Sequence, residues 1–466
     1  MLTASQEKES SPLTMMVEKR PKLLFLAWIF PPLSAPGSVR TWNLVKYLRK
    51  LGWDITVVTP HPSVIRHLDA SEETDAYVEK QRIDRILTGH RWCCLAPYYL
   101  KCWEHNLGWI AGGVCRKIAR HLRVESDSGW IKPAEKACLH LTPDDVDAIL
   151  VTGPPFGAFS LAKRLSARLG RPYILDYRDP WTGNPHANPP ANAATFKKEA
   201  NLLADSSAIT IVSPSWGLAL DRRFGVGPKL HVITNGYDPE EMTAVKPYDF
   251  GHCALVYTGT FIPPKRTIAP FFAALDRLKD SLDGTNNEWR FHYYGVHEDY
   301  IREQAARFNL TDRIVLHGKV SRAEALSAVK GASLAVVITS IDEQSSLEDR
   351  GIVTGKIFEA IGLGAPIVLI TPAGSDAAAI TEGTGLVKSY SGADIDGMAL
   401  RIKEVISGQI PEPKDVEACA WTIIAKKLDV VLREVIVDHT SSRENESVCM
   451  SRIPTMKQQI GASKHY

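Results

Sequence analysis

The first candidate for chemistry is a proline- and glycine-containing loop near the N-terminus. Residues 32–40, Pro-Leu-Ser-Ala-Pro-Gly-Ser-Val-Arg, follow a short apolar run. Gly37 and Ser38 can present backbone N–H groups at the start of a helix, where the helix dipole favours an anion, and Arg40 adds a charged donor. The same residues also fit an ordinary turn in which Ser38 caps the helix. No Gly-x-Gly-x-x-Gly motif is present, which argues against a dinucleotide fold of the hydride-transfer type.

A second candidate, residues 176–181, directly follows an apolar segment that predicts a parallel strand. Ligands of doubly wound sheets bind just outside the carboxyl ends of such strands. Arg178 and Asp179 place a guanidinium and a carboxylate there, and together they can orient a hydroxyl group and accept its proton. The alternative is a buried Arg–Asp pair with a structural role only.

A third candidate follows the first strand expected in the second half of the chain. Residues 257–260, Tyr-Thr-Gly-Thr, form a glycine loop that ends at Thr260, and Lys265 and Arg266 come shortly after it. Two adjacent cations beside such a loop suit a diphosphate. The alternative is a pair of cations that only faces solvent.

The fourth candidate is the segment 351–366, GIVTGKIFEAIGLGAP. Thr354 and Gly355 offer backbone amides at a helix start, with Lys356 next to them. Glu359 falls one turn into that helix. A carboxylate beside a phosphate site is electrostatically unfavourable unless it bonds sugar hydroxyls, as acidic residues do to ribose. The alternative for Glu359 is a surface position.

Apolar runs and helical patterns place these candidates at the ends of strands. Residues 22–29 predict a buried strand, 39–51 a helix that Gly52 ends, and 54–59 a second strand, which together make a βαβ unit. Further strands are expected at 148–152, 172–177, 208–212, 253–257, 289–294, 314–317, 334–338, 366–370 and 386–387, and helices at 269–279, 322–329 and 356–362.

The chain is therefore predicted to be an α/β protein of two consecutive, doubly wound, Rossmann-like domains. We expect the first domain over 21–246, with helices and loops at 60–145, and the second over 250–413, with a linker near 235–251. A helix at 414–437 is expected to close the first domain. Residues 1–20 and 438–466 are expected to be disordered tails.

Composition limits the class of protein. The 466 residues are 44% hydrophobic and 23% charged, with 55 Lys+Arg against 53 Asp+Glu, and this balance gives no reason to expect a nucleic-acid partner. Residues 1–200 nevertheless carry net +7, and residues 201–466 net −5. The eight Cys form no C-x-x-C pair and no zinc-finger spacing, so no structural metal site and a reducing compartment are expected. No secretory signal or apolar run that spans a bilayer is visible, which predicts a cytoplasmic protein or one peripheral to a membrane.

The four candidate segments occur in the same order in a known family. FPPLSAPGSVR, LDYRDPW, YTGTF and TGKIFEAIGLGAPIV resemble motifs of bacterial GT-B glycosyltransferases of retaining family four, especially those of exopolysaccharide, O-antigen and cell-wall biosynthesis. The resemblance extends over residues 22–435. It implies two domains that face a central cleft, and transfer of a sugar from a nucleotide-diphosphate sugar to a glycan acceptor with retention at the anomeric carbon.

The resemblance also implies roles for single positions. The Gly37–Ser38 loop would approach the donor diphosphate and the acceptor, Glu359 would bind the ribose hydroxyls, and the base would pack near residues 317–320. The implied donor-binding residues are Gly37, Ser38, Arg40, Thr260, Lys265, Arg266, Val320, Thr354, Gly355, Lys356 and Glu359, and the implied catalytic residues are Asp179, Arg178 and Lys265.

Three departures from the family pattern stand out. Gly351 occupies the position of the first of two glutamates that the family often carries, and Thr260 stands where an arginine is often found. The histidine often seen after the middle strand is absent, and Arg178 and Asp179 occupy that region. The acceptor-side role of Asp179 is therefore an inference from the residues and not a transfer from the family.

The resemblance implies no cofactor and no bound metal, because protein cations and helix N-termini would stabilise the leaving diphosphate. Arg116, Lys117, Arg120 and Arg123 have helical spacing after Trp103, Trp109 and Ile110, which fits either a solvated helix or contact with an anionic inner membrane and a lipid-linked acceptor. Two other functions stay open: a catalytically silent glycosyltransferase-like partner, which the glutamate missing at Gly351 would suit, and a nucleotide-sugar epimerase.

Overall fold

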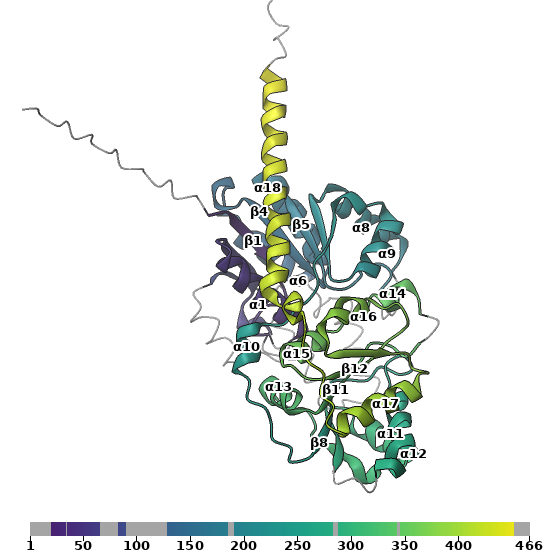
Figure 1. Cartoon of the computed structure of the whole chain (residues 1–466). Helices are drawn as coiled ribbons and strands as arrows, with labels where there is room; N and C mark the ends of the chain where they lie inside the picture. The colour runs from purple at the N-terminus through teal and green to yellow at the C-terminus, as the bar shows by residue number, and fades with distance from the viewer. Residues whose placement is uncertain are drawn as a thin grey trace, which may run out of the picture.

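The computed structural model describes residues 20–33, 35–65, 83–89, 128–184, 191–282, 288–342 and 345–451. Two parallel β-sheets, each flanked by helices, form an upper domain in purple to teal and a lower domain in green (Figure 1). This arrangement confirms the predicted fold class of two doubly wound, Rossmann-like domains.

The first sheet has the strand order β3-β2-β1-β4-β5-β6-β7, and every neighbouring pair is parallel. The chain runs outward from β1 to β3 and then crosses to β4, so a ligand site is expected at the carboxyl ends of β1 and β4. The strands are β1 (Lys22–Leu26), β2 (Asp54–Pro60), β3 (Asp84–Thr88), β4 (Ala148–Gly153), β5 (Tyr173–Tyr177), β6 (Ala208–Ile211) and β7 (Leu230–Val232).

Helices pack on this sheet through apolar faces. In α1, Pro36 stands in the first turn, where its missing N–H leaves no helical bond unmade, and basic residues in the last turn suit the helix dipole. Gly170 and Gly225 end α7 and α9 in the left-handed conformation. The helices are α1 (Pro36–Lys50), α2 (Pro62–Ile65), α6 (Ser128–Ala137), α7 (Gly157–Leu169), α8 (Ala193–Asp205) and α9 (Pro214–Phe224).

The second sheet has the order β10-β9-β8-β11-β12-β13 and is also parallel throughout, so its reversal point lies between β8 and β11. Its strands are β8 (Cys253–Thr258), β9 (Trp289–Tyr294), β10 (Ile314–Leu316), β11 (Leu334–Ile338), β12 (Ile367–Ile370) and β13 (Val387–Tyr390). Its helices are α11 (Ala269–Leu282), α12 (Glu298–Arg307), α13 (Arg322–Gly331), α14 (Leu347–Arg350), α15 (Gly355–Gly362), α16 (Asp376–Thr381) and α17 (Ile395–Ile406).

Two segments join the domains. The short helix α10 (Pro239–Ala244) lies in the linker, and α18 (Trp421–Ser451) returns from the second domain to pack along α1 (Figure 1). Trp421 and Leu428 of α18 share a buried cluster with Leu44 of α1. The helix continues to Ser451, past position 437 where the sequence pattern predicts its end.

The predicted strands of both sheets are confirmed, but the elements not predicted include the edge strands β3 and β7 and the short helices α10 and α14. The interpretation of residues 60–145 as helices and loops is wrong at β3, and no strand is predicted at β7. Both strands lie at sheet edges and are largely accessible, so their sequences, DRILT and LHV, contain polar residues and no apolar run. Helix α10 lies inside the stretch interpreted as a linker.

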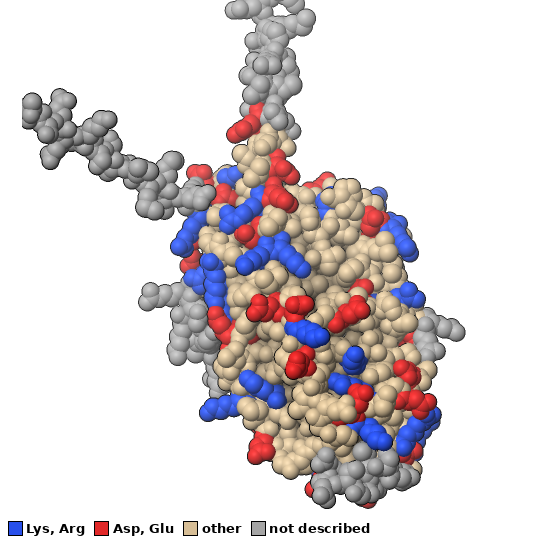
Figure 2. Space-filling model, in the orientation of Figure 1, with Lys and Arg blue, Asp and Glu red and all other residues tan. Residues whose placement is uncertain are grey.

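Two surface properties bear on membrane contact. Within the described ranges, no helix is both long enough and apolar enough to cross a bilayer. On the face seen in Figure 2, basic and acidic side chains are interspersed over both domains. The basic segment with Arg116 and Arg123 lies outside the described residues.

Candidate functional site

Arg40 lies in the interior of the first domain, bonded to Asp176 at the end of β5. Its Nη2 and Nε donate to the two carboxylate oxygens of Asp176 at 2.6 and 3.1 Å. Both side chains are almost fully buried, at 3% and 1% exposed. Its remaining donors go to Asn235 and to the backbone oxygens of residues 233 and 234. The described structure therefore uses the guanidinium of Arg40 to join α1, β5 and the start of the linker.

Asp176 is the acceptor at the centre of this cluster. Besides Arg40, the hydroxyls of Thr152 and Thr210 each donate to it at 2.8 Å. Burial alone would raise the pKa of Asp176, but Arg40 and these two hydroxyls hold it below its usual value. The carboxylate is thus ionised and fully bonded, in an ion pair with Arg40 that the sequence did not predict.

Arg178 and Gly37 are brought into contact at the start of α1. A Cβ added at Gly37 would lie 1.9 Å from Nη1 of Arg178, so only glycine leaves room for this guanidinium. Arg178 donates to the backbone oxygens of Gly153 and Pro154, whereas its Nη1 is buried without a hydrogen-bond partner in the described structure. Burial lowers the pKa of Arg178 to about 10.

Ser38 lies inside α1 and does not cap it. The helix begins at Pro36 after Ala35, and the Ser38 hydroxyl donates back to the backbone oxygen of Leu33. Ser38 is buried, so this hydrogen bond stabilises the loop before α1 from its interior side. The alternative in which Ser38 is the helix cap is therefore wrong.

Asp179 follows Arg178 at the carboxyl end of the middle strand. The side chain is half-buried. Its burial raises the pKa to about 6, and the neighbouring Arg178 opposes that rise. Asp179 is therefore ionised at pH 7 but takes up a proton far more readily than an ordinary aspartate, which suits a group that holds a hydroxyl proton.

In the second domain, three of the predicted residues line one small cavity. Arg266, Thr354, Lys356 and Thr258 give the polar side chains that line a space of about 30 Å³ at the carboxyl ends of β8 and β11, and most of its other lining residues are apolar. Nε of Arg266 is buried and has no hydrogen-bond partner within the described residues. Thr354 immediately precedes α15. The first backbone N–H groups of this helix and the positive end of its dipole both favour an anion at this place.

Lys356 crosses this cavity towards the glycine loop after β8. Its Nζ donates to the backbone oxygen of Thr258 at 2.7 Å, and a Cβ at Gly259 would lie 1.6 Å from that nitrogen. Removal of the ammonium group from water lowers the pKa of Lys356 to about 8, with Glu359 opposing and Arg266 adding to the shift. Gly355 is open, with no atom within 4 Å of an added Cβ.

Lys265 is not part of the cavity wall but is ion-paired beside it. Its Nζ donates to Oδ1 of Asp349 at 2.7 Å, and Asp349 also accepts from Ser346, which caps α14. The Lys265 side chain is 35% exposed, whereas Asp349 is buried. Asp349 therefore holds the partly accessible Lys265 ammonium group beside the glycine loop that follows β8.

Glu359 stands one turn into α15 and is bonded to Arg322 at the start of α13. Nη1 of Arg322 donates to Oε1 of Glu359, and the Glu359 side chain is 20% exposed. The carboxylate is thus half-buried and already oriented, unlike a free surface glutamate.

The remaining predicted residues lie at the edge of this arrangement. Thr260 is exposed, and its backbone oxygen accepts from the hydroxyl of Tyr257 at 3.1 Å. Val320 packs against an apolar cluster that contains Tyr294. The ring of Tyr294 stacks on His317 with centroids 4.0 Å apart and planes 4° from parallel, so the segment 317–320 begins at an aromatic platform.

The structure also explains the glycine at position 351. A Cβ there would lie 2.2 Å from Cδ1 of Trp216, a residue of α9 in the first domain. The Trp216 indole donates to the backbone oxygen of Glu348 at 2.7 Å, and Ser215 donates to Asp376. The space that a glutamate at 351 would need is therefore filled by a contact between the domains.

Sequence reasoning missed three residues of this region: Trp216, Arg322 and Asp349. The pattern Ser346-x-x-Asp349 is a helix-start signal that could have predicted α14, but it carries no information about Lys265. Trp216 and Arg322 contact residues far away along the chain, so no local pattern indicates them. No group of His, Cys, Asp or Glu suited to a metal ion is found among the residues described.

Comparisons with known proteins agree with the two-domain fold. The family model for Glycosyltransferase Family 4 matches residues 37–241, and that for Glycosyl transferases group 1 matches residues 252–407. The two matches divide at the linker between the two sheets. No curated protein matches the sequence.

Solved structures share the fold over nearly the whole chain at low identity. A glycosyltransferase from Rickettsia africae is 12% identical, with 91% of this chain and 98% of that chain covered and a TM-score of 0.53. Anabaena HepE, crystallised with UDP and glucose, is 14% identical, with 92% and 100% covered and a TM-score of 0.50. The lipopolysaccharide outer core galactosyltransferase WaaB is 13% identical, with 89% and 99% covered and a TM-score of 0.52.

Proposed function

The chain belongs to the GT-B glycosyltransferases of the family 4 type, and on that premise we propose which sugar transfer it performs and how. We propose that it moves a sugar from a nucleoside diphosphate to a lipid-linked glycan, with retention at the anomeric carbon, in surface-polysaccharide or cell-wall biosynthesis. The nucleotide lies against the second domain and the acceptor against the first.

The observation that carries this proposal is the pair of cations, Arg266 and Lys356, beside the start of α15. Arg266 has a buried, unbonded Nε, Lys356 reaches across the cavity, and the helix start at Thr354 adds N–H groups. Buried donors without partners are costly, and diphosphate oxygens would satisfy them. The complex of Anabaena HepE with UDP, in the same fold, supports a nucleoside diphosphate as this ligand.

In the proposed reaction the bond between the sugar and the diphosphate breaks while the acceptor oxygen bonds to the anomeric carbon. The leaving diphosphate gains negative charge, which Lys265, Arg266 and Lys356 stabilise. Asp349 keeps Lys265 aimed at this place before the donor arrives. These cations take the part that a divalent metal plays elsewhere, so we propose that the reaction needs no metal ion.

On the acceptor side, Asp179 accepts a hydrogen bond from the attacking hydroxyl. A pKa of about 6 keeps the carboxylate ionised at pH 7. The hydroxyl proton passes to an oxygen of the departing phosphate, which becomes the stronger base as the sugar leaves. Arg178 stands beside Asp179, and its positive charge opposes the rise in the pKa of that carboxylate.

The excess of basic residues in the N-terminal part supports a peripheral contact with anionic membrane lipids. Sedimentation with anionic and with neutral liposomes tests this contact.

The test is a thermal-shift screen with UDP, GDP, ADP, dTDP and CMP, each with and without magnesium. A ligand at one hundred times its dissociation constant stabilises the folded state by about 2.7 kcal/mol. We expect one diphosphate to act without metal, and Lys265→Ala and Glu359→Ala to abolish the shift. Lys388→Ala, an exposed change on β13, is the control that leaves it intact.

Other outcomes would point elsewhere. If none of the nucleotides raises the melting temperature, the proposal is contradicted. Binding without transfer to any glycan acceptor favours the silent partner, which the packing of Trp216 against Gly351 would suit. Conversion of a nucleotide sugar to an isomer without acceptor would identify an epimerase.

A further inference from the structure

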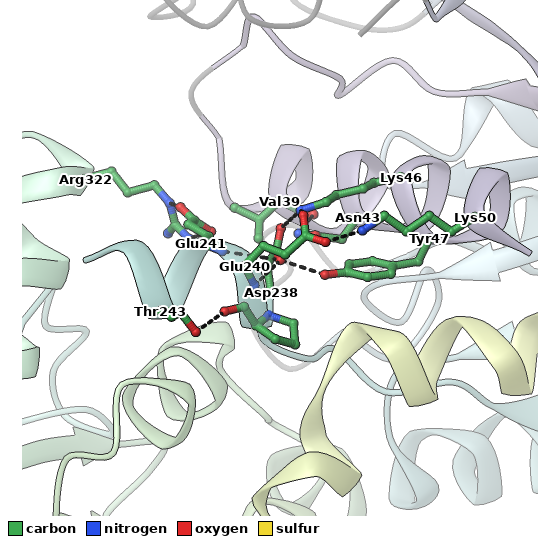
Figure 3. A network of polar contacts seen from close by, with 11 residues as sticks. Val39, Asn43, Lys46, Tyr47, Lys50, Asp238, Glu240, Glu241, Thr243 and Arg322 are labelled. Atoms are coloured by element: carbon green, nitrogen blue, oxygen red, sulfur yellow. Dashed lines mark hydrogen bonds and ion pairs between the residues drawn. The ribbon is translucent and has the colours of Figure 1, made fainter.

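A chain of ion pairs crosses from α1 of the first domain through the linker helix α10 to Arg322 (Figure 3). Arg322 in turn pairs with Glu359. On one side, Lys46 and Lys50 of α1 bind Glu240, and Lys46 also binds Asp238. On the other side, Glu241 binds Arg322 of α13. We call the residues Lys46, Tyr47, Lys50, Asp238, Glu240, Glu241 and Arg322 the linker network.

Arg322 occupies the junction between this network and the donor site. Its Nε and Nη2 donate to the two carboxylate oxygens of Glu241, both at 3.1 Å, and its third nitrogen, Nη1, donates to Glu359. A guanidinium is planar, so a two-point bond to Glu241 fixes the direction of the third donor. The Arg322 side chain is 41% exposed, and exposed ion pairs contribute little to the stability of the fold. The main effect of these bonds is therefore to orient the side chains that they join.

This geometry determines where the Glu359 carboxylate points. Arg322 bonds Oε1 of Glu359 and leaves Oε2 outside that bond. Lys356, one turn earlier on α15, also attracts Glu359. Without Arg322, the carboxylate would therefore turn towards Lys356 and away from the direction in which Arg322 holds it.

Arg322 is in turn tied to the first domain. Asp238 caps α10 and accepts from the hydroxyl of Tyr47 at 2.7 Å and from Lys46 at 2.5 Å, and Asp238 is 5% exposed. Helix α10 is thus anchored on α1 by buried bonds, and Glu241 projects from the anchored helix towards α13 (Figure 3).

We propose that Arg322 is a positioning residue for ribose recognition, held in place by Glu241 of the linker helix, and that it directs Glu359 towards the ribose hydroxyls of the donor. The inference rests on the proposed function, because it takes Glu359 as the ligand of the donor's ribose, the role that the family resemblance implies. It adds a link by which the linker between the domains sets the geometry of nucleotide binding.

The experiment compares ribonucleotides with deoxy analogues by calorimetry. The probe is whichever of UDP, GDP and ADP binds the wild-type chain tightest, together with its 2′-deoxy and 3′-deoxy forms. We expect Arg322→Gln to weaken the ribonucleotide about tenfold and to leave at least one deoxy form within about twofold, because only a bond to a ribose hydroxyl is lost. Glu241→Gln should act in the same direction with a smaller effect.

Two further variants test how Arg322 acts. The double variant Arg322→Gln/Glu359→Gln should bind the ribonucleotide no more weakly than Glu359→Gln alone, because both changes remove one function. Arg302→Gln removes an exposed arginine paired once with Glu298 on α12 and should change neither affinity.

Each other result is decisive. Equal weakening of ribonucleotide and deoxy forms by Arg322→Gln would show a general structural role and overturn the inference. The inference would also be overturned if the wild-type chain bound the ribonucleotide and its deoxy forms equally, or if the two changes in the double variant had additive effects. The proposed function would stand in either case. Binding of none of these three diphosphates and none of dTDP would overturn the proposed function itself.

Discussion

The charged residues at the strand ends of the two domains are arranged in opposite ways. In the first domain Asp176 lies among Arg40, Thr152 and Thr210, and its ion pair with Arg40 is almost fully buried. In the second domain the cation Lys265 is about one-third exposed, although its partner is buried. We call the buried pair closed and the partly exposed pair open. A closed pair has no donor left for a ligand, whereas the cation of an open pair can leave its carboxylate and bind a ligand instead.

The difference separates residues whose donors are used within the fold from residues that lie beside open space. Arg40 looks like an anion ligand in the sequence because it follows a glycine loop, but its donors are used within the domain. Lys356 and Arg266 are adjacent to open space and keep donors for a ligand. Asp179 lies between these extremes, since it is half-buried and its pKa is raised.

The largest expected effect is on the closed cluster. Arg40→Leu leaves the Asp176 carboxylate buried without its charge partner, so we expect a loss of about 3–5 kcal/mol in the free energy of unfolding. Denaturant unfolding measures this loss. The control Lys163→Gln removes an exposed pair with Asp205 and should cost less than about 1 kcal/mol. Equal effects of the two variants would remove the distinction between closed and open pairs.

The second expected effect concerns Asp179 and pH. Its pKa of about 6 in the folded chain exceeds that of an unfolded aspartate, near 4, so the folded state binds the proton more tightly. The contribution of Asp179 to the free energy of unfolding therefore falls as pH rises from about 4 to 6, by roughly 3 kcal/mol, and stays level above that range.

Asp179→Asn cannot ionise, so the difference in unfolding free energy between variant and wild type should grow in favour of the variant over this pH range. Parallel denaturation curves at pH 4.5, 5.5 and 7 measure it. A constant difference would show that Asp179 titrates like an exposed aspartate, as a residue of an open pair would.

The smallest expected effect lies in the open region. Lys356 loses its charge as pH rises through about 8, so nucleotide affinity should fall by up to about tenfold between pH 7 and 9. Lys356→Arg keeps its charge over this range and should bind equally at both values. Calorimetry with the diphosphate found in the thermal-shift screen measures both, and an equal decline in the variant would assign the titration to another group.

Local sequence was sufficient for most of the fold. The buried runs of β4, β5, β11 and β12 predicted strands, because central parallel strands are apolar on both faces. The edge strand β3 was missed because strands with little burial need no such run. The segment around Thr354, Lys356 and Glu359 was placed correctly at a helix start by its pattern alone.

Sequence by itself thus determined most of the elements, the two-domain fold and the loops that carry charge at strand ends. Only the tertiary structure decided which charges are closed and which are open: Arg40 with Asp176, Lys265 with Asp349, and Glu359 with Arg322. It also placed Trp216 where a side chain at Gly351 would lie. The physical reason is that periodicity and caps act within a few residues, whereas an ion pair depends on distance and burial, which are set by the packing of elements far apart in the chain.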